Sequence, residues 1–182
     1  VEGQSGKAYR LPTEHETQVA AEAVQLLPDV IAQIPFGMPE DPTPKGGSGA
    51  SRAFSVDGYG FDRWKKLFTS RQLLALSTLV KWVREAGKVH NGYSLQWREA
   101  ITAYLAVLLD KTADYGSMVC TWHNGRELIG HTFARFALPI TWDNAELAVL
   151  NDVGGSTSSQ LDWVSRFLDH ALIAAHAAPP PT

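Results

Sequence analysis

The sequence has a single cysteine, Cys120, among its 182 residues. One cysteine excludes an internal disulfide and leaves no cysteine pair for a zinc finger. Apolar runs near 18 residues in length are also missing, so we expect no membrane span and a cytoplasmic protein. The net charge is −3, which excludes a chain that is polybasic throughout. With 45% hydrophobic residues, the chain is large enough to bury one sizeable core.

Patterns that carry catalysis or hold a cofactor are equally scarce. The glycines of the stretch 46–49 follow several prolines rather than a strand, so they do not form a phosphate-binding loop. Cys120, His123 and His131 are too few and unsuitably spaced for a structural zinc site. A thiol in the core and imidazoles at the surface explain these three residues better. We therefore predict no catalytic residue, no cofactor site and no metal site in this chain.

Helix signals dominate what is present. Apolar residues recur at helical spacing in four stretches, and each stretch follows a residue type that caps helix N-termini. These four predicted helix starts are Thr13, Thr69, Ser94 and Ser159. A short connector between the second and third stretches predicts that those two helices pack antiparallel. The predicted fold class is all-α, an irregular helical bundle that forms a single domain over residues 1–182.

Two stretches lack helical patterning. Residues 35–58 are rich in proline and glycine and contain few apolar side chains, so we predict a long flexible loop. Residues 117–151 mix aromatic side chains with turn signals such as Asn124-Gly125, which predicts an irregular, aromatic-rich segment. The chain begins at Val1 and has a proline run at 179–181, so we expect it to be a piece of a larger protein.

Positive charge is concentrated in the middle of the chain. Residues 59–111 carry nine basic and four acidic side chains, whereas the regions on both sides are net acidic. Arginine and lysine side chains bind phosphates, and a tryptophan ring can stack on an unpaired base. The residues that we predict to contact nucleic acid are Arg63, Lys65, Lys66, Arg71 and Arg135.

We call Arg63, Trp64, Lys65, Lys66 and Arg71 the basic-aromatic cluster. Two interpretations of it stay open. In one, its cations contact phosphates and Trp64 stacks on a base. In the other, Trp64 packs beneath the following helix as part of a hydrophobic staple, and the charges only face water.

Four blocks of sequence carry a resemblance to a known family. They are AYRLPTEHE (Ala8–Glu16), YGFDRWKKLFTSRQLLALSTLV (Tyr59–Val80), AYLAVLLDKTADYGSMVCTW (Ala103–Trp122), and HTFARFALPITWDNAE (His131–Glu146) followed by QLDWVSRFLDHAL. In this order, the blocks resemble the helical middle segment of adenine-specific DNA methyltransferases that carry a zinc ribbon and an N-terminal domain of unknown function. The blocks together span nearly the whole chain.

The resemblance implies a position within a longer enzyme. In that family the helical segment lies between the glycine-rich S-adenosylmethionine motif and the D-P-P-Y type motif, and neither motif is present here. The resemblance therefore implies a non-catalytic segment, inactive alone, with S-adenosylmethionine as cofactor of the parent protein only. It also implies two partners, namely DNA and the catalytic methyltransferase domain of the same parent. A segment in this position is expected to aid target recognition.

Three functions follow as hypotheses. The first is a helical domain that contacts DNA through its basic middle. The second is a structural or oligomerisation insert of the same parent without nucleic-acid contact, which would expose an apolar patch formed by Phe133, Phe136, Ile140 and Trp142. The third is a small-molecule-binding helical bundle, which would need an apolar pocket among the tryptophans.

Overall fold

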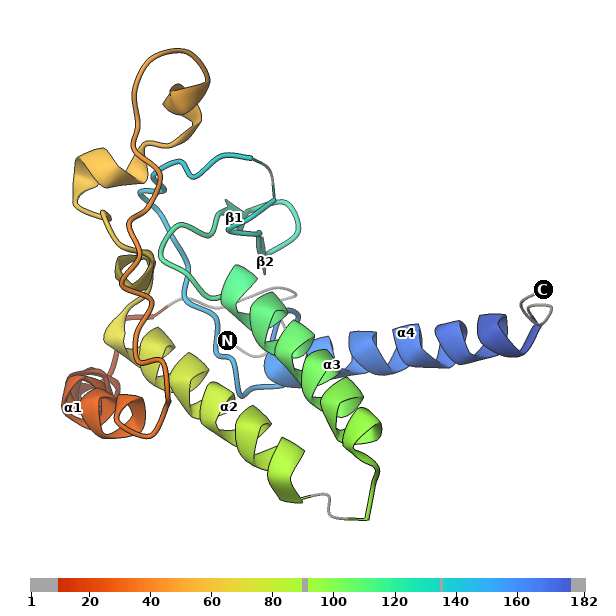
Figure 1. The fold of residues 1–182 in the computed structure, drawn as a ribbon. Helices are drawn as coiled ribbons and strands as arrows, with labels where there is room; N and C mark the ends of the chain where they lie inside the picture. The colour runs from red at the N-terminus through yellow and green to blue at the C-terminus, as the bar shows by residue number, and fades with distance from the viewer. Residues whose placement is uncertain (1–9, 90–91, 135, 178–182) are drawn as a thin grey trace, which may run out of the picture.

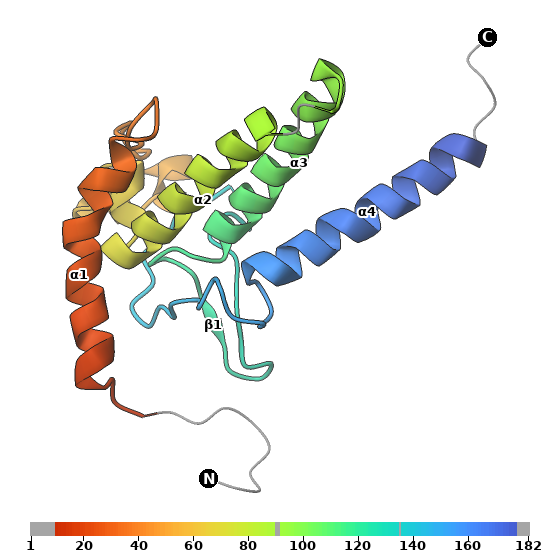
Figure 2. The same ribbon diagram turned by 90° about the horizontal axis from the view of Figure 1, so that it is seen from below.

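A computed structural model describes residues 10–89, 92–134 and 136–177. Within these ranges the chain forms four α-helices, three short 3-10 helices and one two-stranded sheet. The α-helices are α1 (Glu14–Ile31), α2 (Ser70–Val89), α3 (Leu95–Asp114) and α4 (Thr157–Ala177). Each helix packs against the next one in the chain, so that α1, α2, α3 and α4 follow one another across the molecule (Figures 1 and 2). A largely helical fold is therefore confirmed.

The predicted start of α1 is confirmed by a complete capping box. The Thr13 hydroxyl accepts a hydrogen bond from the Glu16 amide at 3.2 Å, and the Thr13 amide donates to the Glu16 carboxylate at 2.7 Å. Pro28 carries the pattern of a helix breaker, yet it lies inside α1, which continues to Ile31. A proline removes one backbone donor, and the helix tolerates this loss because only one more turn follows.

The predicted antiparallel pairing of α2 and α3 is also confirmed. Gln72 donates its amide to the Thr69 hydroxyl at 3.3 Å ahead of α2, and the Ser94 hydroxyl accepts from the amide of Trp97 at the start of α3. The two helices come close at Gly87, where an added Cβ would lie 2.6 Å from the Thr102 hydroxyl oxygen. A residue larger than glycine at position 87 would push the helices apart.

The proline-rich stretch before α2 contains the 3-10 helices η1 (Gly49–Ala53), η2 (Val56–Tyr59) and η3 (Trp64–Leu67). Its side chains form a core with residues from much later in the chain. This core comprises the buried residues Val56, Leu67, Val119 and Leu138, with Phe54, Phe61, Trp64 and Phe68 packed around them. The stretch is thus tied into the fold, although the flexibility predicted for residues 35–58 stays a prediction.

The irregular segment between α3 and α4 contains a small two-stranded sheet, so the largely helical fold is confirmed and the all-α description is not. Strand β1 (Trp122–His123) pairs antiparallel with β2 (Leu128–Ile129) across the predicted turn at Asn124-Gly125. A second core lies beside this hairpin and comprises Cys120, Ile129 and Leu147. The burial of Cys120 confirms the prediction of a core thiol.

Helix α4 departs most from expectation. It begins at Thr157 and is capped by the hydroxyl of Ser156, three residues before the predicted cap Ser159. Leu161, Phe167 and Leu172 had the spacing of an inward face, but all three are about half exposed. Both views show α4 diverging from α3 toward its C-terminal end (Figures 1 and 2). Among the described helices, none combines the length and the apolar character that a membrane crossing requires.

Candidate functional site

The basic-aromatic cluster lies on η3 and the first turn of α2, and three of its four cations pair with acids. The ammonium of Lys65 pairs with the Glu40 carboxylate, and that of Lys66 pairs with Asp62 at 2.7 Å. The Lys66 hydrogen bond holds the pKa of the Asp62 carboxyl below its ordinary value. A phosphate approaching here would have to displace carboxylates that already neutralise these side chains.

The other members of the basic-aromatic cluster are also engaged. The Arg63 guanidinium donates to the Glu40 carbonyl at 2.7 Å. Arg71 forms an ion pair with Glu146 at 2.8 Å, which joins α2 to the segment before α4. The fifth predicted contact, Arg135, lies outside the described residues. The structure therefore brings four of the five predicted residues together, but in a patch where acids accompany them.

Backbone bonds show what the basic-aromatic cluster does for the fold. The amides of Trp64 and Lys65 donate to the carbonyls of Asp41 and Pro39, and the Thr43 amide donates to Asp62. The Trp64 ring packs against the core around Leu67. These bonds tie the stretch 39–43 to η3 and agree with the structural interpretation of Trp64, while nucleic-acid contact by the cations stays a prediction.

A second group of cations lies farther along α2. Lys81, Arg84 and Lys88 are spaced by three and four residues, so they share one side of the helix. The Lys81 ammonium lies 5.2 Å from the ring centroid of Trp82, and the Arg84 guanidinium lies 5.8 Å from that of Phe36. We call Lys81, Trp82, Arg84 and Lys88 the α2 stripe.

The α2 stripe differs from the cluster in its charge balance. Lys88 pairs with Glu85 at 2.7 Å, whereas Lys81 and Arg84 have no ion pair with a carboxylate in the part of the chain that the structure describes. Trp82 is exposed, and so is the Phe36 ring beside Arg84. The hydrogen bond from Lys88, and then the charges of Lys81 and Arg84, lower the pKa of the Glu85 carboxyl, which lies close to both cations but forms its ion pair with Lys88. Exposed rings beside cations that have no ion pair are a combination suited to contact bases and phosphates.

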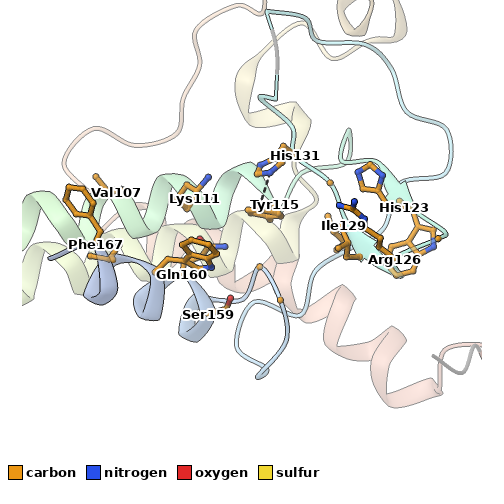
Figure 3. A pocket seen from close by; sticks show the side chains of 18 of the residues that line it. Val107, Lys111, Tyr115, His123, Arg126, Ile129, His131, Ser159, Gln160 and Phe167 are labelled. Atoms are coloured by element: carbon orange, nitrogen blue, oxygen red, sulfur yellow. Dashed lines mark hydrogen bonds between the residues drawn. The ribbon is translucent and has the colours of Figure 1, made fainter. Parts of the chain in front are cut away.

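An apolar groove of about 1300 Å³ separates α3 from α4. Its walls include Tyr104 and Val107 of α3 and Trp163 and Phe167 of α4, and the rings of Tyr104 and Phe167 lie 6.3 Å apart. Figure 3 shows Val107 and Phe167 at one end of the groove and His123 and Arg126 of the hairpin at the other. We call this hollow the α3–α4 groove.

Tyr115 and His131 line the α3–α4 groove, and His131 Nε2 lies 3.0 Å from the Tyr115 hydroxyl (Figure 3). The Asp114 carboxylate completes a hydrogen-bonded trio, because it lies 2.6 Å from His131 Nδ1. Burial, and then the Asp114 charge, raise the pKa of Tyr115. A phenol that keeps its proton is suited to donate a hydrogen bond rather than to act as a nucleophile.

No pattern in the sequence predicts this trio. His131 was interpreted as a surface imidazole, and it is indeed exposed, but its partner Asp114 lies 17 residues earlier in the chain. Cys120 and His123, the other two residues of the candidate zinc site, are not members of this hydrogen-bonded trio. The thiol of Cys120 instead contacts the Thr132 hydroxyl at 3.2 Å and the Asp114 carbonyl at 3.4 Å.

The predicted exposed patch on the irregular segment is only partly free. Phe136, Trp142 and Phe133 are exposed. Their rings nevertheless meet aromatic rings of the earlier stretch edge-on or tilted, in the pairs Phe54–Phe136, Tyr59–Trp142 and Trp64–Phe133. These contacts, 5.1 to 6.2 Å between ring centroids, hold the two irregular stretches together.

The chain was compared with models of protein families, with curated proteins and with solved structures, and none of the three comparisons found a match.

Proposed function

We propose that this chain is a non-catalytic helical segment of an adenine-specific DNA methyltransferase and that it contacts DNA through the α2 stripe. The family assignment rests on the four resembling blocks and their order in the sequence. In such an enzyme, S-adenosylmethionine and the catalytic residues belong to other parts of the parent protein. The segment would act in the cytoplasm by helping to hold the target duplex while a base is methylated.

One observation carries the choice of surface. Lys81 and Arg84 lie against aromatic rings, whereas Lys65, Lys66 and Arg71 lie against carboxylates. Binding to DNA gains free energy when a cation replaces the counterions of a phosphate. A cation that already has a carboxylate partner gains less, because that partner must be displaced or must remain near the phosphate.

Fluorescence anisotropy on a labelled DNA duplex at low salt tests the proposal. The double variant Lys81→Gln/Arg84→Gln is expected to weaken binding by about tenfold or more, since two phosphate contacts are lost. The matched control Lys65→Gln/Lys66→Gln removes the same charge from the basic-aromatic cluster and is expected to change affinity less than about twofold. Circular dichroism of each variant checks that the helices are retained.

Two results of the anisotropy experiment would contradict the proposal. Absence of binding by the unaltered chain at low salt would overturn DNA contact altogether. Loss of binding in the Lys65→Gln/Lys66→Gln control, with the α2 stripe variant unaffected, would return the contact to the basic-aromatic cluster.

A further inference from the structure

One polar side chain of the α3–α4 groove is buried without a partner. Gln160, in the first turn of α4, is only 4% exposed, yet it lines the groove. Its backbone amide donates to the Ser156 carbonyl, but its side-chain amide forms no hydrogen bond within the part of the chain that the structure describes. A buried amide without a partner is unfavourable for folding, so its presence needs a functional explanation.

Aromatic side chains accompany this amide. Trp163 and Phe167 follow Gln160 at intervals of three and four residues on α4, so the three residues share one side of the helix. The facing wall contains Tyr104 of α3 and Tyr115 just after it. Figure 3 shows Gln160 between the Phe167 end of the groove and the hairpin end. Rings beside a buried amide suit a planar ligand that stacks on a ring and forms hydrogen bonds through its edge.

The hairpin end of the α3–α4 groove supplies one available positive charge. Arg126 lines this end and has no ion pair with any residue that the structure describes. Lys111 is less available, because the Asp114 carboxylate lies 3.9 Å from its ammonium. One guanidinium suits a ligand with a single anionic group. A nucleic-acid strand carries a phosphate on every nucleotide and requires cations along its whole path.

We propose that the α3–α4 groove binds a free adenine nucleotide. A glutamine amide presents a donor beside an acceptor, which matches the amino group and a neighbouring ring nitrogen of adenine. The base stacks on Trp163 while its edge meets Gln160, and the phosphate lies toward Arg126. The groove of about 1300 Å³ exceeds the roughly 300–1,000 Å³ of most small-molecule sites, so the nucleotide fills only the part between Gln160 and Arg126.

Calorimetric titration of the chain with AMP tests the proposal. The unaltered chain is expected to bind AMP with a dissociation constant below about 1 mM. Gln160→Leu should raise this constant more than about fivefold, because the base loses both hydrogen bonds. Gln25→Leu is the matched control, since it makes the same change at an exposed position of α1, outside the groove, and should leave the constant unchanged.

Thermal denaturation separates a ligand-binding role of Gln160 from a structural one. Without nucleotide, Gln160→Leu should leave the melting temperature unchanged or raise it, because an amide without a partner is replaced by an apolar group of similar size. Saturating AMP should raise the melting temperature of the unaltered chain and have little effect on this variant. A clear loss of stability in Gln160→Leu without nucleotide would assign the amide to the fold and overturn the proposal.

Two ligand comparisons test the contacts one at a time. The analogue of AMP that lacks the base amine should bind the unaltered chain more weakly than AMP, and Gln160→Leu should bind both alike. Adenosine should likewise bind more weakly than AMP, and Arg126→Gln should remove that difference. Absence of AMP binding would overturn the proposal. So would an adenine oligonucleotide that binds far more tightly than AMP and depends equally on Gln160, because the ligand would then be a strand.

The nucleotide site and the proposed DNA contact can fail separately. The site uses α3, α4 and the hairpin, and it shares no residue with the α2 stripe. Lys81→Gln/Arg84→Gln should therefore leave AMP binding unchanged, and Gln160→Leu should leave duplex binding unchanged.

Discussion

The basic-aromatic cluster and the α2 stripe contain the same residue types but have different neighbours. In the cluster, Glu40, Asp62 and Glu146 each reach a cation. In the stripe, rings of Trp82 and Phe36 lie beside Lys81 and Arg84, while the Glu85 carboxylate pairs with Lys88. Positive charge in a sequence therefore does not by itself locate a phosphate-binding surface. The partners that the fold brings to each cation decide whether its charge stays available.

The largest expected effect concerns the core beneath the basic-aromatic cluster. Leu67 ends η3 and is fully buried among Val56, Val119 and Leu138. Leu67→Ala should lower the free energy of unfolding by about 2–5 kcal/mol, because a buried leucine is lost and a cavity remains. Urea denaturation measures this, with exposed Leu150→Ala as the control. A loss no larger than that of the control would contradict the structural role assigned to η3.

An effect nearly as large is expected on the α2 stripe, this time in binding. Trp82→Ala should weaken the affinity for single-stranded DNA by about 1–3 kcal/mol if a base stacks on the ring. The exposed Trp142 packs against Tyr59 and belongs to the segment between α3 and α4, so Trp142→Ala is the control. Anisotropy with a labelled oligonucleotide measures both variants. Equal losses of DNA affinity in the two variants would contradict the assignment of base stacking to Trp82.

The ion pair between Lys65 and Glu40 should contribute little to stability. Both side chains are substantially exposed, and exposed pairs contribute less than about 1 kcal/mol. Lys65→Ala should therefore change the free energy of unfolding by less than that amount and leave DNA affinity unchanged. Thermal denaturation and anisotropy on the same preparation measure both quantities. A clear loss of DNA affinity in Lys65→Ala would show that the basic-aromatic cluster contacts DNA, which would contradict the difference drawn between it and the α2 stripe.

The smallest effect is a shifted titration within the basic-aromatic cluster. Lys66 holds the pKa of Asp62 below its ordinary value, so the charged carboxylate favours the folded state. This contribution is complete above the unfolded pKa of about 3.9 and disappears as the pH falls through the lower folded pKa. Lys66→Ala should move the Asp62 titration, followed by carboxyl NMR, back toward higher pH. An unmoved titration would mean that the pair does not form in solution.

Local sequence signals predicted the parts of the fold that depend on local bonds. The caps at Thr13, Thr69 and Ser94 each lie within three residues of their partners, and all three are present. At α4 two serines compete as caps, and the turn before the helix favours Ser156 over Ser159. The two-residue strands are too short to leave an alternating pattern, so only the turn between them was visible in the sequence.

The sites depended on contacts between distant residues, which one sequence does not reveal. Lys65 and its partner Glu40 are 25 residues apart, and Arg71 and Glu146 are 75 residues apart. No local pattern in the sequence therefore predicts that carboxylates neutralise cations of the basic-aromatic cluster. The α2 stripe did have one, because Lys81, Arg84 and Lys88 recur at helical spacing. The exposure of the apolar face of α4 had no local signal, because a core helix and an interface helix have the same apolar pattern.

The salt dependence of duplex binding tests the central claim most directly. The logarithm of the binding constant falls with the logarithm of salt concentration by about 0.9 for each phosphate contacted. Removing Lys81 and Arg84 should make this slope shallower by about two, while removing Lys65 and Lys66 should leave it unchanged. A slope that becomes shallower only in the Lys65 and Lys66 variant, or in neither variant, would contradict the assignment of DNA contact to the α2 stripe.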